Sequence, residues 1–155
     1  MVKQEELKNM DERSRLRAEK KIATFTDSVD SRPTNRERRG VIRLIDEHDQ
    51  LRKLYRHQVV AVQRLLIGNG ALLAIHDMGT GKTITGILAI AAIHNTLPRL
   101  KEELSIVVCP LSVLTVWGET IKSWTNYGAQ ILVATKQTDL TESALENAKI
   151  VVTTA

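Results

Sequence analysis

The chain has 155 residues, of which 43% are hydrophobic, and a formal net charge of +4. These values are ordinary for one globular domain, while the single cysteine, Cys109, excludes an internal disulfide framework and fits a reducing compartment. The first twenty residues lack a signal-peptide pattern, and the longest apolar run, residues 84–93, is too short to span a bilayer. We therefore expect an intracellular protein without a membrane partner, nuclear in a eukaryote and otherwise cytoplasmic.

The excess of positive charge lies in the first third of the chain. Residues 1–57 contain 15 Lys and Arg against 11 Asp and Glu, whereas residues 58–155 contain 7 of each kind. Basic clusters can follow a phosphate backbone, but a solvated extension of mixed charge is the commoner reason for such a composition. Both interpretations stay open for the basic cluster Arg36, Arg38, Arg39 and Arg43.

Residues 1–48 are predicted to form a charged extension, helical or disordered. Apolar positions over residues 1–23 are too sparse for a continuous buried stripe, which indicates a fraying surface helix or disorder. Thr, Ser and Asp are frequent over residues 24–33, which is typical of a linker. A second helix is predicted to begin at Thr34, because Thr34 and Glu37 have the spacing of a capping box.

Residues 49–155 are predicted to form an α/β domain with a parallel sheet, because apolar runs of strand length alternate with helical patterns. Strands are expected at residues 71–75, 105–109, 131–134 and 149–154. Helices are expected after Gln58 as far as Gly68, over residues 83–93, from the N-cap Ser112 to Trp124, and over residues 140–148. The inner face of the third of these helices is predicted to carry Val113, Val116, Trp117, Thr120, Ile121 and Trp124.

The strongest local signal lies between the first strand and the second helix of this domain. There the sequence reads His76-Asp-Met-Gly-Thr-Gly-Lys-Thr83, which is the order strand, glycine turn, Lys-Thr, helix that a phosphate-binding loop requires. Glycines let backbone N–H groups converge on phosphate oxygens, and the helix N-terminus adds partial positive charge. His76 stands where the full pattern has a glycine. The alternative is a glycine-rich turn that happens to carry Lys-Thr.

Several segments in one order resemble a known family. They are Leu54-Tyr-Arg-His-Gln58, Ile75 to Thr83, Ile106-Val-Val-Cys-Pro-Leu-Ser-Val-Leu114 with Trp117, and Ile150-Val-Val-Thr-Thr154. Together they look like the opening part of a Swi/Snf-type ATPase of helicase superfamily two. The resemblance implies a P-loop NTPase (RecA-like) fold, here incomplete, that binds ATP and Mg²⁺ and acts on double-stranded DNA, as in chromatin remodelling.

The resemblance also implies roles for single residues. Lys82 would reach the β- and γ-phosphates, and the Thr83 hydroxyl would ligate Mg²⁺. Gln58 would hydrogen-bond the adenine edge, which its amide donor and acceptor can match. The remaining nucleotide contacts would come from Asp77, Met78, Gly79, Thr80 and Gly81. Nucleic-acid contacts would come from Pro110, Ser112, Thr153 and Thr154, although Ser112 is as well explained as a plain helix cap.

In the resembled family, catalysis also requires an acidic Asp-Glu motif and a second lobe with an arginine finger. Neither occurs within these 155 residues, so we expect the chain to need the remainder of such an ATPase core and not to hydrolyse ATP alone. The family commonly has Ala-Asp-Glu before the Met-Gly pair, where this chain has Ile75-His76-Asp77, and His76 is expected to be a lining or packing residue rather than a catalytic base. The alternative function is a nucleotide-binding or protein-interaction module that never hydrolyses ATP. An unrelated P-loop kinase fits the quoted segments less well.

Overall fold

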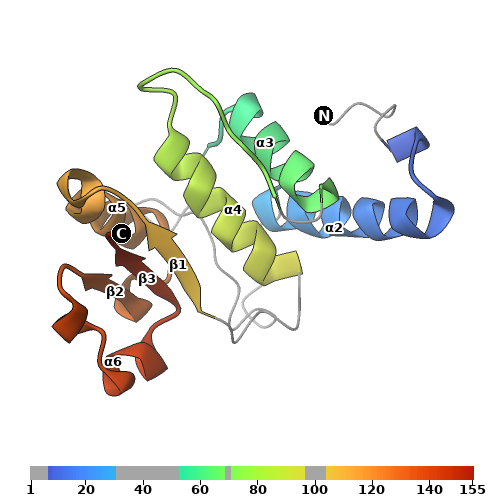
Figure 1. The fold of residues 1–155 in the computed structure, drawn as a ribbon. Coiled ribbons are helices and arrows are strands. Elements are labelled where there is room, and N and C mark those ends of the chain that lie inside the picture. Colours follow the sequence, from blue (N-terminus) through green and yellow to red (C-terminus); the bar gives the residue numbers. More distant parts are fainter. Residues whose placement is uncertain (1–6, 31–52, 69–70, 97–103) are drawn as a thin grey trace. The chain divides into compact units, whose positions relative to one another are not determined.

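The computed structural model describes residues 7–30, 53–68, 71–96 and 104–155 (Figure 1). The chain divides into two units: the described residues up to Thr96 belong to the first and those from Leu104 to the second. The first contains the helices α2 (Glu12–Asp30), α3 (Arg56–Ile67) and α4 (Lys82–Thr96). The second contains β1 (Ser105–Val108), α5 (Leu111–Trp124), η2 (Gly128–Gln130), β2 (Ile131–Ala134), η3 (Gln137–Asp139), α6 (Glu142–Asn147) and β3 (Ile150–Thr153).

Helix α2 is longer than the sequence predicts and packs on α3 and α4. The linker prediction is wrong from residue 24 to Asp30, because these residues continue the helix. Phe25 is only 1% exposed and Ala18 only 4%. One buried aromatic ring removes a large apolar area from water, which outweighs the weak helix propensity of the Thr and Ser residues around it. At the other end, the Asp11 carboxylate accepts a hydrogen bond from the Ser14 backbone N–H at 3.0 Å.

The two predicted helices that flank the glycine-rich stretch are confirmed as α3 and α4. Helix α3 buries the predicted apolar side except for Val59, which is half-buried, and Gly68 is its C-cap. Helix α4 is apolar on most sides and lies against α3 and α2. Its buried side chains are Thr85, Ile87, Leu88, Ala91, Ala92 and His94.

The strand predicted at residues 71–75 is not formed. This segment has no regular secondary structure, and Leu73 and Ile75 are each 83% exposed. A strand is stable when neighbours satisfy its backbone N–H and C=O groups and cover its side chains. None of the described strands pairs with residues 71–75, and the apolar side chains of this segment are exposed.

The other three predicted strands are confirmed and form one parallel sheet in the order β1-β3-β2. Ile150 of β3 is in register with Ser105 of β1 and with Ile131 of β2. The central strand is buried along Ile150, Val151 and Val152, which are 0 to 2% exposed. This placement explains why its sequence is apolar without alternation.

Helix α5 packs on β2 and β3, but not as the sequence predicts. Its N-cap is Pro110 rather than Ser112, which lies in the first turn of the helix and is exposed. The buried face consists of Leu114, Gly118 and Ile121. Of the predicted inner residues, Ile121 is therefore confirmed and Trp117, Thr120 and Trp124 are half-buried, whereas Val113 and Val116 are 38% and 52% exposed. A Cβ atom on Gly118 would lie 2.6 Å from Cγ2 of Val133, so the missing side chain lets the helix approach the strand. This close approach sets the face that is buried.

The predicted α/β class with a parallel sheet is therefore confirmed, while the strand of residues 71–75 is absent from it. The helix predicted to begin at Thr34 and the boundary between residues 48 and 49 lie outside the described residues and stay predictions. Cys109 is a free, buried thiol, as expected of a small hydrophobic residue. No helix of the described residues is both long and apolar enough to cross a membrane.

Candidate functional site

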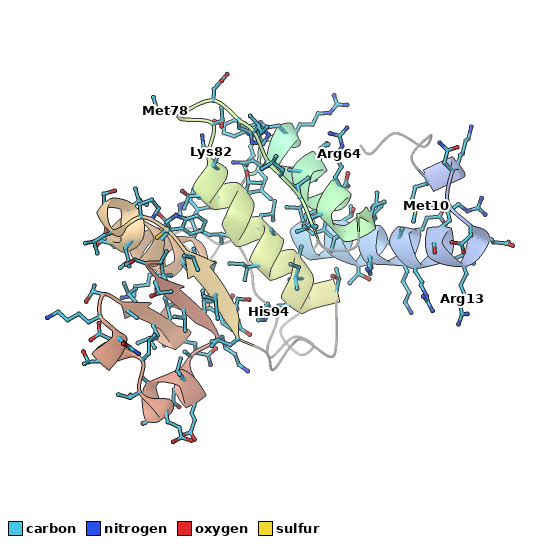
Figure 2. All side chains as sticks on the ribbon, viewed as in Figure 1. Met10, Arg13, Arg64, Met78, Lys82 and His94 are labelled. Atoms are coloured by element: carbon cyan, nitrogen blue, oxygen red, sulfur yellow. The ribbon has the colours of Figure 1, made fainter. Side chains whose placement is uncertain are left out.

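Residues 76–81, which we call the glycine loop, lead into the first residue of α4. Gly79 and Gly81 both have a φ angle of +80°, in the left-handed region that L side chains avoid. Within the loop, the Thr80 hydroxyl donates a 2.8 Å hydrogen bond to the Asp77 carbonyl. Met78 stands at the outer end of the loop, 94% exposed (Figure 2). The turn predicted from the two glycines thus has the backbone conformation that requires them.

Lys82 begins α4, and its ammonium group is folded over the glycine loop (Figure 2). The Nζ atom donates to the carbonyl oxygens of His76 at 3.0 Å and of Asp77 at 2.9 Å. These acceptors are neutral and the lysine is exposed. Because charged oxygens are stronger acceptors for an ammonium group, an anion at this position can replace them. Thr83 follows in the first turn of α4 and is half-buried.

Gln58 lies on α3 but is bonded to the glycine loop. Its Oε1 atom accepts from the Tyr55 backbone N–H at 2.9 Å, and its Nε2 atom donates to the Gly81 carbonyl at 3.4 Å. The residue is 2% exposed. A Cβ atom on Gly81 would lie 2.6 Å from the same Nε2 atom, so this close approach needs a glycine as well. Contact of Gln58 with a nucleotide base therefore requires its side chain to turn outward.

A group of aromatic rings joins the start of α3 to the glycine loop. The rings of Tyr55 and His57 are stacked at 5.8 Å with an interplanar angle of 10°. The His57 ring also meets His76 at 5.3 Å and 79°, and His57 Nε2 lies 2.9 Å from the Thr80 carbonyl oxygen. Sequence patterns do not assign a role to Tyr55 or to His57. No spacing rule relates His57 to Thr80, which lies 23 positions later.

A cavity of about 210 Å³ adjoins Lys82 and is lined by α3, α4 and the segment from Leu72 to His76. His76 lines it, as expected, and its Nδ1 atom is buried without a hydrogen-bond partner. The other lining residues are mostly apolar or small: Leu65, Leu72, Ala74, Thr85, Gly86 and Ala89. The cavity therefore offers little beyond Lys82 to bind a charged group.

The predicted nucleic-acid residues lie in the second unit, and the fold brings them to one edge of the sheet. Because β1 and β3 are parallel neighbours, Val108 is in register with Thr153 and both strands end at the same edge. The Cys109 N–H donates to the Thr153 carbonyl at 3.0 Å, just before Pro110. Ser112 is exposed in the first turn of α5, and Thr154 follows β3. Two pairs of residues that are far apart in the sequence, Pro110 with Ser112 and Thr153 with Thr154, thus lie at one edge.

A family model for the SNF2-related domain matches residues 9–155. The chain belongs to the SNF2-related family. This match confirms the resemblance to Swi/Snf-type ATPases of helicase superfamily two. Searches among curated proteins and among solved structures found no match.

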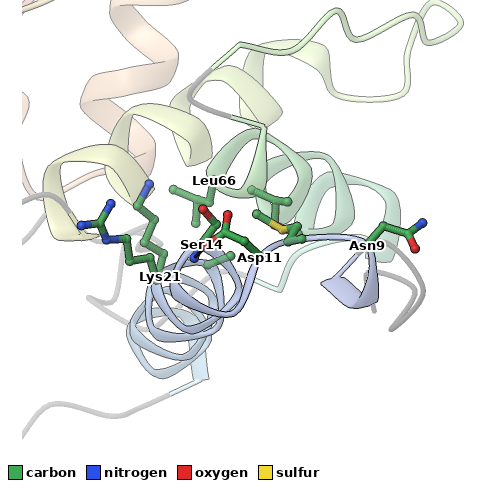
Figure 3. Close-up of a pocket in the computed structure, with 9 residues that line it drawn as sticks. Asn9, Asp11, Ser14, Lys21 and Leu66 are labelled. Atoms are coloured by element: carbon green, nitrogen blue, oxygen red, sulfur yellow. Dashed lines mark hydrogen bonds between the residues drawn. The ribbon is translucent and has the colours of Figure 1, made fainter.

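The SNF2-related match begins at residue 9 and so includes α2 as well as the glycine loop and the sheet. A further cavity, of about 400 Å³, lies between the N-terminal half of α2 and the end of α3 (Figure 3). Asp11, Ser14, Lys21 and Leu66 are among the residues that line it, and none of the predicted site residues does. Among the described residues, no group of three or more His, Cys, Asp or Glu side chains is placed to hold a metal ion.

Proposed function

We propose that the glycine loop binds the phosphates of ATP with Mg²⁺, and that the chain is the first part of a Swi/Snf-like DNA-dependent ATPase. The observation that carries this proposal is the position of Lys82. Its ammonium group is bonded to two carbonyl oxygens of a loop that has two left-handed glycines and runs directly into α4. Such a loop presents backbone N–H groups and partial positive charge to an anion.

The residues present fit a nucleotide-bound magnesium ion. Mg²⁺ keeps several waters and is commonly held by substrate phosphates with only one or two protein ligands. Thr83, in the first turn of α4, supplies one hydroxyl close to Lys82 in the chain. When bound, the ion neutralises phosphate charge, while Lys82 and the amides of residues 77–81 orient the same phosphates.

The base would be bound next to the start of α3. Gln58 is held by Tyr55 and Gly81, so we propose that it contacts adenine only after its weaker, 3.4 Å hydrogen bond to Gly81 is released. Such a movement would link occupation of the base site to the conformation of the glycine loop. Gly81 would then lose one of its neighbours but keep its left-handed backbone.

The test of nucleotide binding is titration calorimetry of the full 155-residue chain with Mg²⁺-ATP. Lys82→Ala removes a charge-assisted contact worth about 1.5–3 kcal/mol, so the dissociation constant should rise roughly tenfold or more. Lys122→Ala removes the same charge from an exposed position on α5 and should leave the constant unchanged. Equal affinities for the wild type and Lys82→Ala would disprove the assignment.

The same proposal includes double-stranded DNA as the partner of the sheet edge that carries Pro110, Ser112, Thr153 and Thr154. Short hydroxyls and backbone N–H groups at helix starts suit phosphate contacts that do not read sequence. Ser112→Asp should weaken binding of a labelled DNA duplex, because it adds negative charge at that edge. Ser123→Asp places the same charge near the other end of α5 and is the control. Equal weakening in both variants would show a general charge effect only.

We further propose that hydrolysis needs groups beyond those of this chain. Turnover requires a carboxylate site for Mg²⁺, a residue that positions water and positive charge on the transferred phosphate. Asp139, Glu142 and Glu146 lie in η3 and α6 rather than at the carboxyl end of a buried strand. Phosphate release with saturating DNA should therefore equal that of Lys82→Ala. Phosphate release that DNA stimulates above this control would contradict the proposal. ATP binding without phosphate release would also fit the alternative function, a nucleotide-binding module that never hydrolyses ATP.

A further inference from the structure

His57 contacts the glycine loop at both of its ends. Its Nε2–H donates a 2.9 Å hydrogen bond to the Thr80 carbonyl, and its ring meets the His76 ring at 5.3 Å. His76 is the first residue of the loop, and Thr80 lies between the two left-handed glycines. The exposed imidazole therefore bridges the loop from the first turn of α3.

The ring has a fixed orientation because its neighbours hold two sides of it. Tyr55 stacks on one face with an interplanar angle of 10°, and His76 makes an edge contact at 79°. A carbonyl oxygen has no proton to donate, so the bond to Thr80 requires that His57 carry its proton on Nε2. The contacts with Tyr55 and His76 thus orient the His57 Nε2–H toward the Thr80 carbonyl oxygen.

The bonded carbonyl belongs to the peptide that joins Thr80 to Gly81. A trans peptide is planar, so its C=O and N–H groups point in opposite directions. Holding the Thr80 oxygen toward His57 turns the Gly81 N–H away from His57. This peptide turns by rotation about the Cα–C bond of Thr80 and the N–Cα bond of Gly81, and the second rotation is little restricted because Gly81 has no Cβ atom.

We propose that His57 is a positioning residue that fixes the Thr80–Gly81 peptide so that the Gly81 N–H faces the nucleotide phosphates. This inference rests on the proposed nucleotide-binding function of the glycine loop. His57 does not touch the nucleotide; it lowers the cost of ordering the loop before binding. Since His57 is exposed, its bond competes with water, and removing it should weaken phosphate binding about fivefold.

The test compares the wild type and two variants of the full chain by calorimetry with Mg²⁺-ATP, Mg²⁺-pyrophosphate and adenosine. His57→Phe keeps an aromatic ring between Tyr55 and His76 but has no donor, and should bind ATP and pyrophosphate about fivefold more weakly. His57→Gln has a planar N–H donor and should bind both within about twofold of the wild type. Adenosine affinity should change much less than pyrophosphate affinity, because adenosine has no phosphate to meet the Gly81 N–H. The amide resonance of Gly81 should shift in His57→Phe and much less in His57→Gln.

A purely structural role for His57 predicts a different pattern. In that case both variants would lower the urea midpoint and weaken adenosine and pyrophosphate alike, which would overturn the inference. Equal binding of pyrophosphate by the wild type and His57→Phe, with Lys82→Ala impaired, would overturn the inference and leave the proposed function standing. If the wild type binds neither ATP nor pyrophosphate, both the inference and the proposed function are wrong.

Discussion

Two apolar segments of similar length, residues 71–75 and β3, have opposite environments in this chain. The first, Ala-Leu-Leu-Ala-Ile, is exposed and has no regular structure, with Ile75 at 83% exposure. The second, Ile-Val-Val-Thr, is the central strand of a sheet, with Ile150 at 1% exposure. Hydrophobicity alone does not separate them.

The difference shows that neighbours decide whether an apolar run becomes a strand. Strand propensity favours β3, in which every residue is β-branched, but the whole propensity scale spans only about 1 kcal/mol. Full burial of one large aliphatic side chain contributes about 1.5–3 kcal/mol. β3 has a strand on each side, whereas residues 71–75 have none among the described residues. Burial by the rest of the chain therefore outweighs the intrinsic preference of the segment itself.

Hydrogen exchange should show the largest contrast between the two segments. The amides of Val151 and Val152 should exchange only on global unfolding of their unit, which for ordinary domains costs about 5–15 kcal/mol. The amides of residues 72–75 should exchange close to the rate of an unfolded peptide. The measurement is exchange followed by NMR on the full chain. Similar protection of both segments would mean that residues 71–75 pair with a strand in solution.

Matched truncations should sharpen the comparison. Ile150→Ala should lower the free energy of unfolding by about 2–5 kcal/mol, because it leaves a cavity at a fully buried site. Ile75→Ala removes the same atoms from an exposed side chain and should change the free energy by no more than about 0.5 kcal/mol. Urea unfolding of both variants checks this pair. A comparable loss in Ile75→Ala would contradict the exposed position of residue 75.

A smaller effect is expected where α5 approaches β2, a neighbour of β3. Gly118→Ala would place a Cβ atom 2.6 Å from Val133, and overpacking of this kind costs about 1–3 kcal/mol. Helix propensity offsets about 1 kcal/mol of this cost. The net destabilisation, measured in urea, should be about 1 kcal/mol. Thr115→Ala, at an exposed position of α5, is the control and should be neutral or slightly stabilising.

The smallest effect concerns the turn after β2. Hydrogen bonds from the Lys136 N–H and from Thr135 lower the pKa of the Asp139 carboxyl below its ordinary value of 3.8. Because the pKa is lower in the folded state, the ionised group stabilises the fold above pH 3.8, and this contribution is lost as pH falls through the folded pKa.

Asp139→Ala should therefore lower the thermal midpoint at neutral pH, and the difference from the wild type should shrink below about pH 4. Melting curves between about pH 7 and about pH 2.5 check this. Asp139→Asn keeps one oxygen acceptor without a titrating group, so its difference from Asp139→Ala should not change with pH. A wild-type advantage over Asp139→Ala that persists unchanged in acid would contradict the assignment.

The sequence predicts the strands of the second unit well because each is a short apolar run, and β1 and β2 both pair with β3. Sequence-based prediction fails where a structure depends on one tertiary contact that has no periodic pattern in the sequence. Helix α2 extends to Asp30 because Phe25 is buried, yet one buried ring gives no periodicity. The buried face of α5 is predicted only in part, at Ile121, because its centre is a glycine, Gly118, which an apolar pattern does not count.

The candidate site divides in the same way. The turn through Gly79 and Gly81 follows from local chemistry, and so does the helix directly after it, which is predicted from Thr83 and begins at Lys82. The contacts of Gln58 and His57 with the glycine loop join residues 23 positions apart. They depend on how α3 packs beside α4, which neither composition nor spacing reveals.

The strand order β1-β3-β2 also constrains when the second unit can fold during synthesis. Both outer strands pair with β3, and Ile150 follows its partner Ser105 by 45 residues. A ribosome that adds about 5–20 residues per second takes a few seconds to cover that distance. Throughout this interval β1 lacks its partner strand, and β2 also lacks it once residues 131–134 have been made. We therefore expect chaperones that bind exposed apolar segments to bind the nascent chain until residue 153 has left the exit tunnel.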